Sequence, residues 1–248
     1  RNPVLSGAVG VAVEDGAQLD ASELLVSGTD GLGMLLLDAT SSCQDCVFTD
    51  NLFAGVAAAP GVLQLTDTSI SGTGADPNLG GGYGIAAGDL YGLGEDSAVV
   101  SVEGGLVEDS GLAAAYLVGP GTYLFSGTDL AGSEAVSERV GEWRQGDAVL
   151  ARDGVTAWDE EGSTGLLLES VTLRASGGAG VFLDASSATV RDVDFEDNEL
   201  DLVQQGCSGV DEPVGLDDGL QTVLCPDYDY TLPPPSFDVY LTAVEAAL

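Results

Sequence analysis

The chain has no lysine, no histidine and only six arginines among its 248 residues. This shortage excludes nucleic acid as a partner, because binding the phosphate backbone requires a basic surface. Anionic membrane surfaces are disfavoured for the same reason. No apolar run has the length of a transmembrane helix, so no membrane insertion is predicted. Without histidine, the cysteines also lack their usual partner in a mixed metal site.

Acidic residues are abundant: 41 Asp and Glu give a formal charge of −35, yet 44 % of the residues are hydrophobic, which favours a folded chain over a disordered one. The charge is typical of a solvated, salt-tolerant surface, with divalent cations or a basic partner as alternatives. In the densest acidic stretch, residues 192–201, strand alternation spreads the carboxylates along a face. No cofactor is therefore predicted, and calcium is the weaker alternative.

Two four-residue patterns recur, in places at intervals of about 22 residues, the length of one β-helix coil. The first is an apolar residue, two small, polar or acidic residues, then Ser, Thr or Asn; it starts at Val26, Phe48, Ile70, Val107, Phe125, Leu173 and Phe195. The second is Gly or Ala followed by an alternating apolar stretch; it starts at Gly10, Gly33, Gly55, Gly84, Ala114, Ala148 and Gly180. Alternation with period two predicts strands, and Gly allows the sharp turn into them.

A third strand precedes the first pattern. Its inward positions align from coil to coil and predict columns inside a solenoid. Three coils supply one residue to each of three columns, in the same column order: Val190, Val193 and Phe195 in one coil, Leu168, Val171 and Leu173 in another, and Cys43, Cys46 and Phe48 in a third. The Ser, Thr and Asn positions are expected to satisfy backbone groups at a corner.

These repeats resemble the right-handed parallel β-helix repeat proteins of the pectate-lyase-like superfamily, especially secreted bacterial members with no assigned activity, over about residues 9–205. The expected fold is all-β: a single-stranded right-handed parallel β-helix with side-loop insertions and a C-terminal cap. The predicted parts are the β-helix over 1–205, a disulfide-closed capping loop and Pro-rich linker over 206–235, and an apolar tail over 236–248. The resemblance implies little about activity, since the superfamily includes lyases, hydrolases, tailspikes and adhesins.

The four cysteines predict disulfides and thus an exported protein, and the resemblance implies a secreted bacterial protein that is extracellular or at the cell surface. A Cys207–Cys225 bond would close the capping loop, whereas Cys43 and Cys46 are either bonded or reduced at interior positions. The chain begins Arg1-Asn2-Pro3 without a signal peptide, which indicates a processed or excised region.

Insertions interrupt the repeat at two corners. One pair, over 74–83 and about 129–147, lies before the second pattern, and the other pair, over 88–97 and 154–165, lies after the strand that this pattern opens. In a solenoid, inserted loops are where binding sites concentrate. Aromatic rings and arginines in these loops are candidates for a glycan-binding surface, where rings stack on sugars; the alternative is that the rings fold onto the coils. The candidate ligand-binding residues are Trp143, Trp158, Tyr83, Tyr91, Arg144 and Arg152.

No catalytic residue is assigned. The resemblance implies Lys or Arg as the base of a lyase, and clustered Asp with a His and an Arg–Lys pair in a hydrolase, whereas this chain has no Lys, no His and few Arg. Acid–base pairs remain conceivable as Asp147 with Asp153, or Asp192 with Asp194.

The favoured function is therefore a non-catalytic extracellular structural or surface-assembly protein that stacks end to end through its tail. Its candidate assembly residues are Phe237, Tyr240, Leu241 and Val244. A glycan-binding or adhesive module is the alternative, and a polysaccharide lyase or hydrolase the third. The expected partners are other copies, a larger surface assembly or a polysaccharide.

Overall fold

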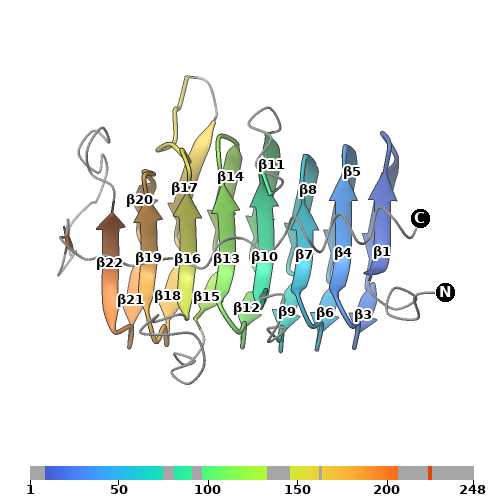
Figure 1. The fold of residues 1–248 in the computed structure, drawn as a ribbon, viewed down its shortest axis with the longest axis horizontal. Helices are drawn as coiled ribbons and strands as arrows, with labels where there is room; N and C mark the ends of the chain where they lie inside the picture. Colours follow the sequence, from blue (N-terminus) through green and yellow to red (C-terminus); the bar gives the residue numbers. More distant parts are fainter. Residues whose placement is uncertain are drawn as a thin grey trace.

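The computed structural model describes residues 9–74, 81–90, 97–132, 146–161, 164–205 and 223–224. Within these ranges the chain forms strands and turns and no helix. Three sheets of parallel strands run side by side along the molecule, and the chain visits them in a fixed cycle (Figure 1). This is a parallel β-helix, which confirms the predicted fold class.

We name the sheets A, B and C in the order in which each coil enters them. Sheet A contains β1 (Val9–Glu14), β4 (Leu32–Leu37), β7 (Ala54–Ala58), β10 (Tyr83–Gly88), β13 (Ala113–Val118), β16 (Asp147–Arg152), β19 (Ala179–Asp184), β22 (Leu200–Gln205) and β23 (Val223–Leu224). Sheet B contains β2 (Gln18–Ser22), β5 (Ala39–Gln44), β8 (Gly61–Thr66), β11 (Ala98–Glu103), β14 (Thr122–Ser126), β17 (Gly165–Glu169) and β20 (Thr189–Arg191). Sheet C contains β3 (Leu25–Ser27), β6 (Val47–Thr49), β9 (Ser69–Ser71), β12 (Leu106–Glu108), β15 (Asp129–Ala131), β18 (Thr172–Arg174) and β21 (Asp194–Glu196).

The strand register confirms the predicted interior columns. In sheet B, Cys43 pairs with Leu65, and Leu168 pairs with Val190. In sheet C, Leu173 pairs with Phe195. In sheet A the second residue of each Gly pattern forms one continuous row, namely Val11, Met34, Val56, Ile85, Ala115, Val149 and Val181. These rows fill the interior with buried apolar side chains.

One occurrence of the first pattern was assigned to the wrong corner. Phe125 lies in β14 of sheet B, and Thr128 lies in the turn towards β15, where its hydroxyl donates to the Val102 and Gly104 carbonyls. The residue that pairs with Val107 is Leu130. The insertion expected from about residue 129 therefore starts later, because 129–131 are strand β15. The confusion arises because the same pattern of an apolar residue and a Thr three positions later occurs at two different corners.

Aspartate forms many of the sharp corners. Thirteen described residues other than glycine have a positive φ, and nine of these are Asp, for example Asp45 with φ 53° and Asp50 with φ 56°. Asp tolerates this left-handed conformation better than most residues, because its short polar side chain bonds locally. Part of the acidic composition is therefore a requirement of the backbone.

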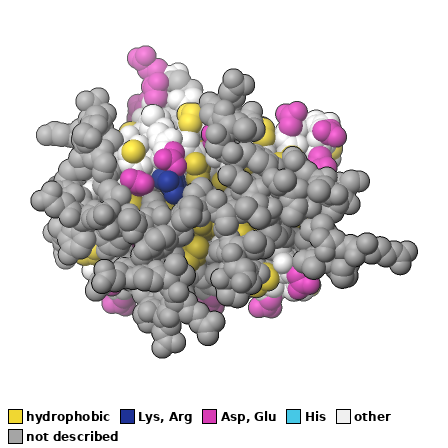
Figure 2. Space-filling model, viewed as in Figure 1, with side chains coloured by type: hydrophobic (Ala, Val, Ile, Leu, Met, Phe, Trp, Pro, Cys, Tyr) yellow, Lys and Arg dark blue, Asp and Glu magenta, His cyan; other side chains and the backbone are white. Residues whose placement is uncertain are grey.

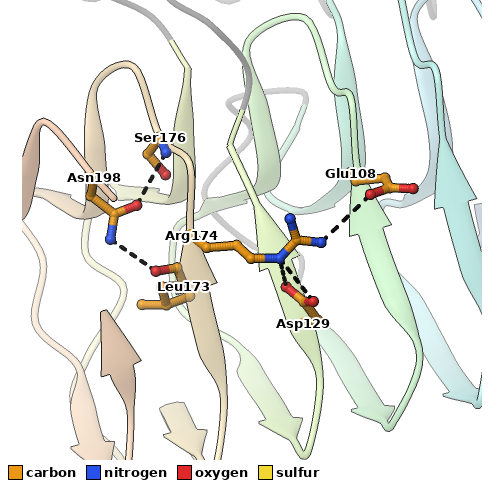
Figure 3. A network of polar contacts seen from close by, with 6 residues as sticks. All are labelled: Glu108, Asp129, Leu173, Arg174, Ser176 and Asn198. Atoms are coloured by element: carbon orange, nitrogen blue, oxygen red, sulfur yellow. Dashed lines mark hydrogen bonds and ion pairs between the residues drawn. The ribbon is translucent and has the colours of Figure 1, made fainter. Parts of the chain in front are cut away.

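The corner from sheet C to sheet A carries the predicted Ser, Thr and Asn column. Asn198 accepts the Ser176 backbone N–H at 3.1 Å and donates to the Leu173 carbonyl at 2.8 Å (Figure 3). Asn51 accepts the Thr29 hydroxyl at 2.7 Å. The hydroxyls of Thr73, Ser110 and Ser176 and the amide nitrogen of Asn51, by contrast, are buried with no partner among the described residues. Asn198 thus satisfies the corner as predicted, whereas Asn51 does so only through its amide oxygen and these three hydroxyls do not.

The insertions at residues 74–83, 88–97 and 154–165 join strands of consecutive sheets at the predicted corners. In the described part of the chain, no helix is long and apolar enough to cross a membrane.

Candidate functional site

The outer face of sheet A is the most unusual surface of the solenoid. Along β4, Met34 and Leu36 point into the interior, and Leu35 points outward into a second, separate apolar cluster. We call the outward side chains of this cluster the A face; they form two neighbouring rows, Leu35, Ala57, Ala86, Tyr116, Leu150, Phe182 and Val203, and Leu32, Ala54, Tyr83, Ala113, Asp147 and Ala179. Sheet A is thus apolar on both sides, as in sheets with both faces covered.

Three aromatic rings lie together on this face. Tyr83 stacks on Tyr116 with ring centroids 4.5 Å apart, and Phe53 meets Tyr83 edge to face at 6.4 Å. Such arrangements are preferred by aromatic pairs. Burial, reinforced by the neighbouring Tyr116, raises the pKa of Tyr83 above its ordinary value, so its hydroxyl stays neutral.

A buried carboxyl group interrupts the apolar rows. Asp147 opens β16 and accepts the Ala179 backbone N–H at 2.7 Å. Burial raises the pKa of this carboxyl to about 7, against the lowering effect of the Ala179 hydrogen bond. A Cβ on Gly178 would lie 2.4 Å from the Asp147 Oδ1, so a residue without a side chain is needed there. Asp147 therefore titrates near neutral pH inside a closely packed site.

At the far end of β16, Arg152 pairs with Asp153, with 2.6 Å between Nε and Oδ2. Asp184 is paired in register with Arg152 on β19. Burial raises the pKa of Asp184, Arg152 lowers it, and Asp153 raises it further, with a net upward shift. The A face thus ends in a charged group of one arginine and two acids.

The predicted glycan-binding residues fall into separate places. Tyr83 and Arg152 both lie on or beside the A face, but Tyr83 is only 6 % exposed. Trp158 lies on the excursion between β16 and β17, where its backbone N–H donates to the Thr189 hydroxyl of sheet B at 3.2 Å. Tyr91, Trp143 and Arg144 lie outside the described residues. A glycan surface that joins Trp158 to Tyr83 stays a prediction, and the described contacts place the two residues on different sheets.

The Asp147–Asp153 pair does not have the spacing of glycosidase carboxyl groups. Asp147 and Asp153 stand at opposite ends of β16, six residues apart, which in a strand corresponds to about 20 Å. Glycosidase carboxyl groups are about 5–9.5 Å apart. Asp192 and Asp194 were expected on one strand. In the structure Asp192 is a corner residue with φ 49°, and the strand β21 begins at Asp194. Among the described residues, no three Asp, Glu or Cys side chains converge on a point where a metal ion could bind.

Cys43 and Cys46 form a disulfide across the corner from sheet B to sheet C, around Asp45. Both residues are buried in the interior, as their columns predicted. Cys207 and Cys225, predicted to close the capping loop, lie outside the described residues, as do the candidate assembly residues Phe237, Tyr240, Leu241 and Val244.

The arginines of sheets B and C bridge acidic rows that sequence reasoning did not identify. The Arg174 Nε lies 2.8 Å and 2.9 Å from the two Asp129 carboxylate oxygens, and the Arg174 Nη2 lies 3.6 Å from Glu108 (Figure 3). Arg191 pairs with Glu160 and Glu169 in the same way. Arg174 pairs in register with Ala131 of β15. The insertion after β15 breaks the spacing of about 22 residues between these two strands, so the sequence did not reveal this pairing. Arg174 therefore joins acids of two different coils, on β12 and β15, whereas Arg191 joins the excursion after β16 to β17.

No protein-family model matches this chain, and no curated protein or solved structure matches it either. The resemblance to pectate-lyase-like β-helix proteins rests on the repeat patterns alone, and the structure supports only its fold.

Proposed function

We propose that the protein is a non-catalytic structural solenoid of the cell exterior that stacks end to end with other copies. The observation that carries this proposal is the set of open strand edges at both ends of the described solenoid. Within the described residues, β2 and β20 are the outermost strands of sheet B, and β3 and β21 those of sheet C. Unpaired edges of this kind are templates for further strand pairing.

At the edge of the first coil, backbone hydrogen-bonding groups point in the direction that pairing with a strand of another copy requires. The Ala17 carbonyl accepts the Thr40 N–H, and the Glu23 N–H donates to the Gln44 carbonyl. Because backbone groups of a strand alternate in direction, the N–H and C=O groups of Gln18, Asp20 and Ser22 point away from β5, towards the open end. A strand from another copy would pair with these groups.

The charge favours stacking along the axis over lateral association. The outer faces of sheets B and C carry acidic side chains, among them Asp20, Glu103 and Glu108. Two such faces repel each other, most strongly at low salt, since the Debye length is about 10 Å at 0.1 M. The disulfide of Cys43 and Cys46 supports an oxidising, extracellular environment.

The test is sedimentation velocity with negative-stain electron microscopy over a concentration series at low and high salt. We expect rods that lengthen with protein concentration, and more so at high salt. Ser22→Pro removes one edge-facing N–H and adds a ring at the edge, so this variant should stay monomeric. Ser22→Ala keeps the N–H and should stack like the parent protein. Single short rods at every concentration and salt level would contradict the proposal.

The alternative function, glycan binding, has one supporting observation. Trp158 is half-buried on an excursion that is attached to sheet B by hydrogen bonds from the Ala157 and Trp158 N–H groups to Ser187 and Thr189. A ring held at a fixed surface position suits stacking on a sugar. Binding to a panel of polysaccharides that is lost in Trp158→Ala, with stacking unchanged, would favour this alternative.

A further inference from the structure

The A face is buried although its side chains point away from the solenoid interior. The row from Leu35 to Val203 is at most 7 % exposed. Among the described residues, strands of sheet A contact their neighbours in the sheet and the adjoining strands of sheets B and C, and no strand packs across the outer side. Seen from this side, separate patches of apolar side chains are visible, and a basic side chain lies beside acidic ones (Figure 2). An apolar surface of this extent requires a cover.

The chain itself has a segment of suitable length and position. The last described strand, β23, pairs with β22 at the end of sheet A, and the 24 residues from Cys225 to Leu248 follow it (248 − 224 = 24). Seven strand spacings separate β22 from β1, which is about 34 Å. The 16 residues 233–248 reach about 50 Å when extended, enough to cross the whole face.

The sequence of this segment also fits the face. Its first three residues are Pro233, Pro234 and Pro235, a sequence that favours an extended backbone. Phe237, Val239 and Leu241 then alternate, so an extended segment places all three side chains on one side. Its only ionisable side chains apart from tyrosine are Asp238 and Glu245.

Both rows of the A face combine alanines with larger side chains on β7, β10 and β13. Ala57 and Ala86 lie between Leu35 and Tyr116 in one row, and Ala54 and Ala113 flank Tyr83 in the other. Because an alanine is much smaller than its neighbours, an apolar side chain such as Phe237 or Leu241 can pack beside it.

We propose that residues 233–248 bind the A face of the same chain as its cover, with Phe237 and Leu241 in apolar contact. The tail residues predicted for assembly then face their own solenoid, and stacking runs through the strand edges alone. The A face is then closed to polysaccharides, and the stacked tyrosines serve to hold the tail. This inference is independent of the stacking proposal, because either one can fail without the other.

Photo-crosslinking tests the proposal in the full chain. Phe182→p-benzoylphenylalanine places a photoreactive ring on the A face, and Val99→p-benzoylphenylalanine places one on the outer side of sheet B, where Val99 is 39 % exposed. After irradiation of an equal mixture of isotopically light and heavy protein, mass spectrometry maps the cross-links. We expect links from position 182 to residues 233–248 in light–light and heavy–heavy pairs only, and none from position 99. Light–heavy links at position 182 would mean that another copy supplies the tail, and no link to 233–248 would mean that something else covers the face; either result overturns the proposal.

A second pair of variants tests the contact residues. Phe237→Asp combined with Leu241→Asp should lower the docking equilibrium constant by about a hundredfold, since two large apolar contacts are lost. Ser236→Asp combined with Thr242→Asp adds the same charge outside the apolar alternation and should leave the cross-link yield unchanged. Equal yields in the two double variants would also overturn the proposal.

Discussion

The buried Asp147 makes a quantitative prediction about the pH dependence of stability. Its pKa is about 7 in the folded protein and its ordinary value is 3.8. Between these two values the folded state binds more protons than the unfolded state, so the free energy of unfolding falls as the pH rises from about 4 to about 7. Above about pH 7 the loss is complete, because the group is then ionised in both states.

The size of the effect follows from the two pKa values. Relative to a group that stays neutral, the Asp147 carboxyl lowers the free energy of unfolding by about 2 kcal/mol at pH 5 and about 4 kcal/mol at pH 8. Asp147→Asn cannot ionise, and it keeps an amide oxygen that accepts the Ala179 N–H. The Asn variant should therefore gain about 2–3 kcal/mol on the parent protein between pH 5 and pH 8.

Urea unfolding followed by circular dichroism at both pH values measures this difference. Comparison of the two proteins cancels the titration of the other carboxylates, which both share. Asp194→Asn, which alters an exposed carboxylate on β21, is the control and should show nearly the same stability difference at both pH values. A stability difference between Asp147→Asn and the parent that does not change with pH would refute the reasoning.

Three further predictions concern the scaffold. Phe48→Ala removes a fully buried interior ring and should lower the free energy of unfolding by about 3–5 kcal/mol in urea unfolding; a loss below 1 kcal/mol would contradict the interior assignment. Gly105→Ala should lower the melting temperature more than Gly16→Ala does. The new Cβ at position 105 lies 2.2 Å from the Thr68 carbonyl oxygen, whereas the Cβ at position 16 has no atom within 4 Å. Equal shifts of the melting temperature in the two variants would be inconsistent with this packing. The Cys43–Cys46 disulfide should resist reductant in the folded protein, because both residues are at most 2 % exposed. The native protein is treated with reductant and an alkylating reagent and then analysed by mass spectrometry. Alkylation of Cys43 and Cys46 would contradict this prediction.

The coil pattern could be predicted because each inward position repeats its chemistry in every coil. Val190 below Leu168, and Leu65 below Cys43, are fixed by the requirement that an interior without solvent be filled by apolar side chains. The insertions were located for the same reason, as breaks in that periodicity. The Phe125 pattern was misplaced because two corners share one local sequence preference, and only the pairing of Leu130 with Val107 separates them.

The A face was missed although the sequence contained a signal for it. Met34-Leu35-Leu36 and Val181-Phe182-Leu183 are continuous apolar runs, which are typical of strands buried on both sides. The alternation predicted from the sequence does not distinguish such runs from strands with a single apolar side. The pKa of Asp147 could not have been anticipated, because it depends on how closely Ala179 and its neighbours enclose the carboxyl group.

The aspartates at the corners limit how the composition can change. Asp15, Asp38, Asp45, Asp50 and Asp67 all adopt φ between 48° and 56°, which most side chains avoid. A neutral version of this protein is obtained at these positions with the least strain by Asn or Gly, although Ser170, Ala175 and Ala185 adopt the same conformation at other corners. Over generations, drift in surface charge would be slower at the corners than on the strands and loops, because most side chains cost more free energy in this conformation. A strongly acidic isoelectric point is then partly inherited from the turn geometry, and only the remainder is free to follow the salinity or chemistry of the habitat.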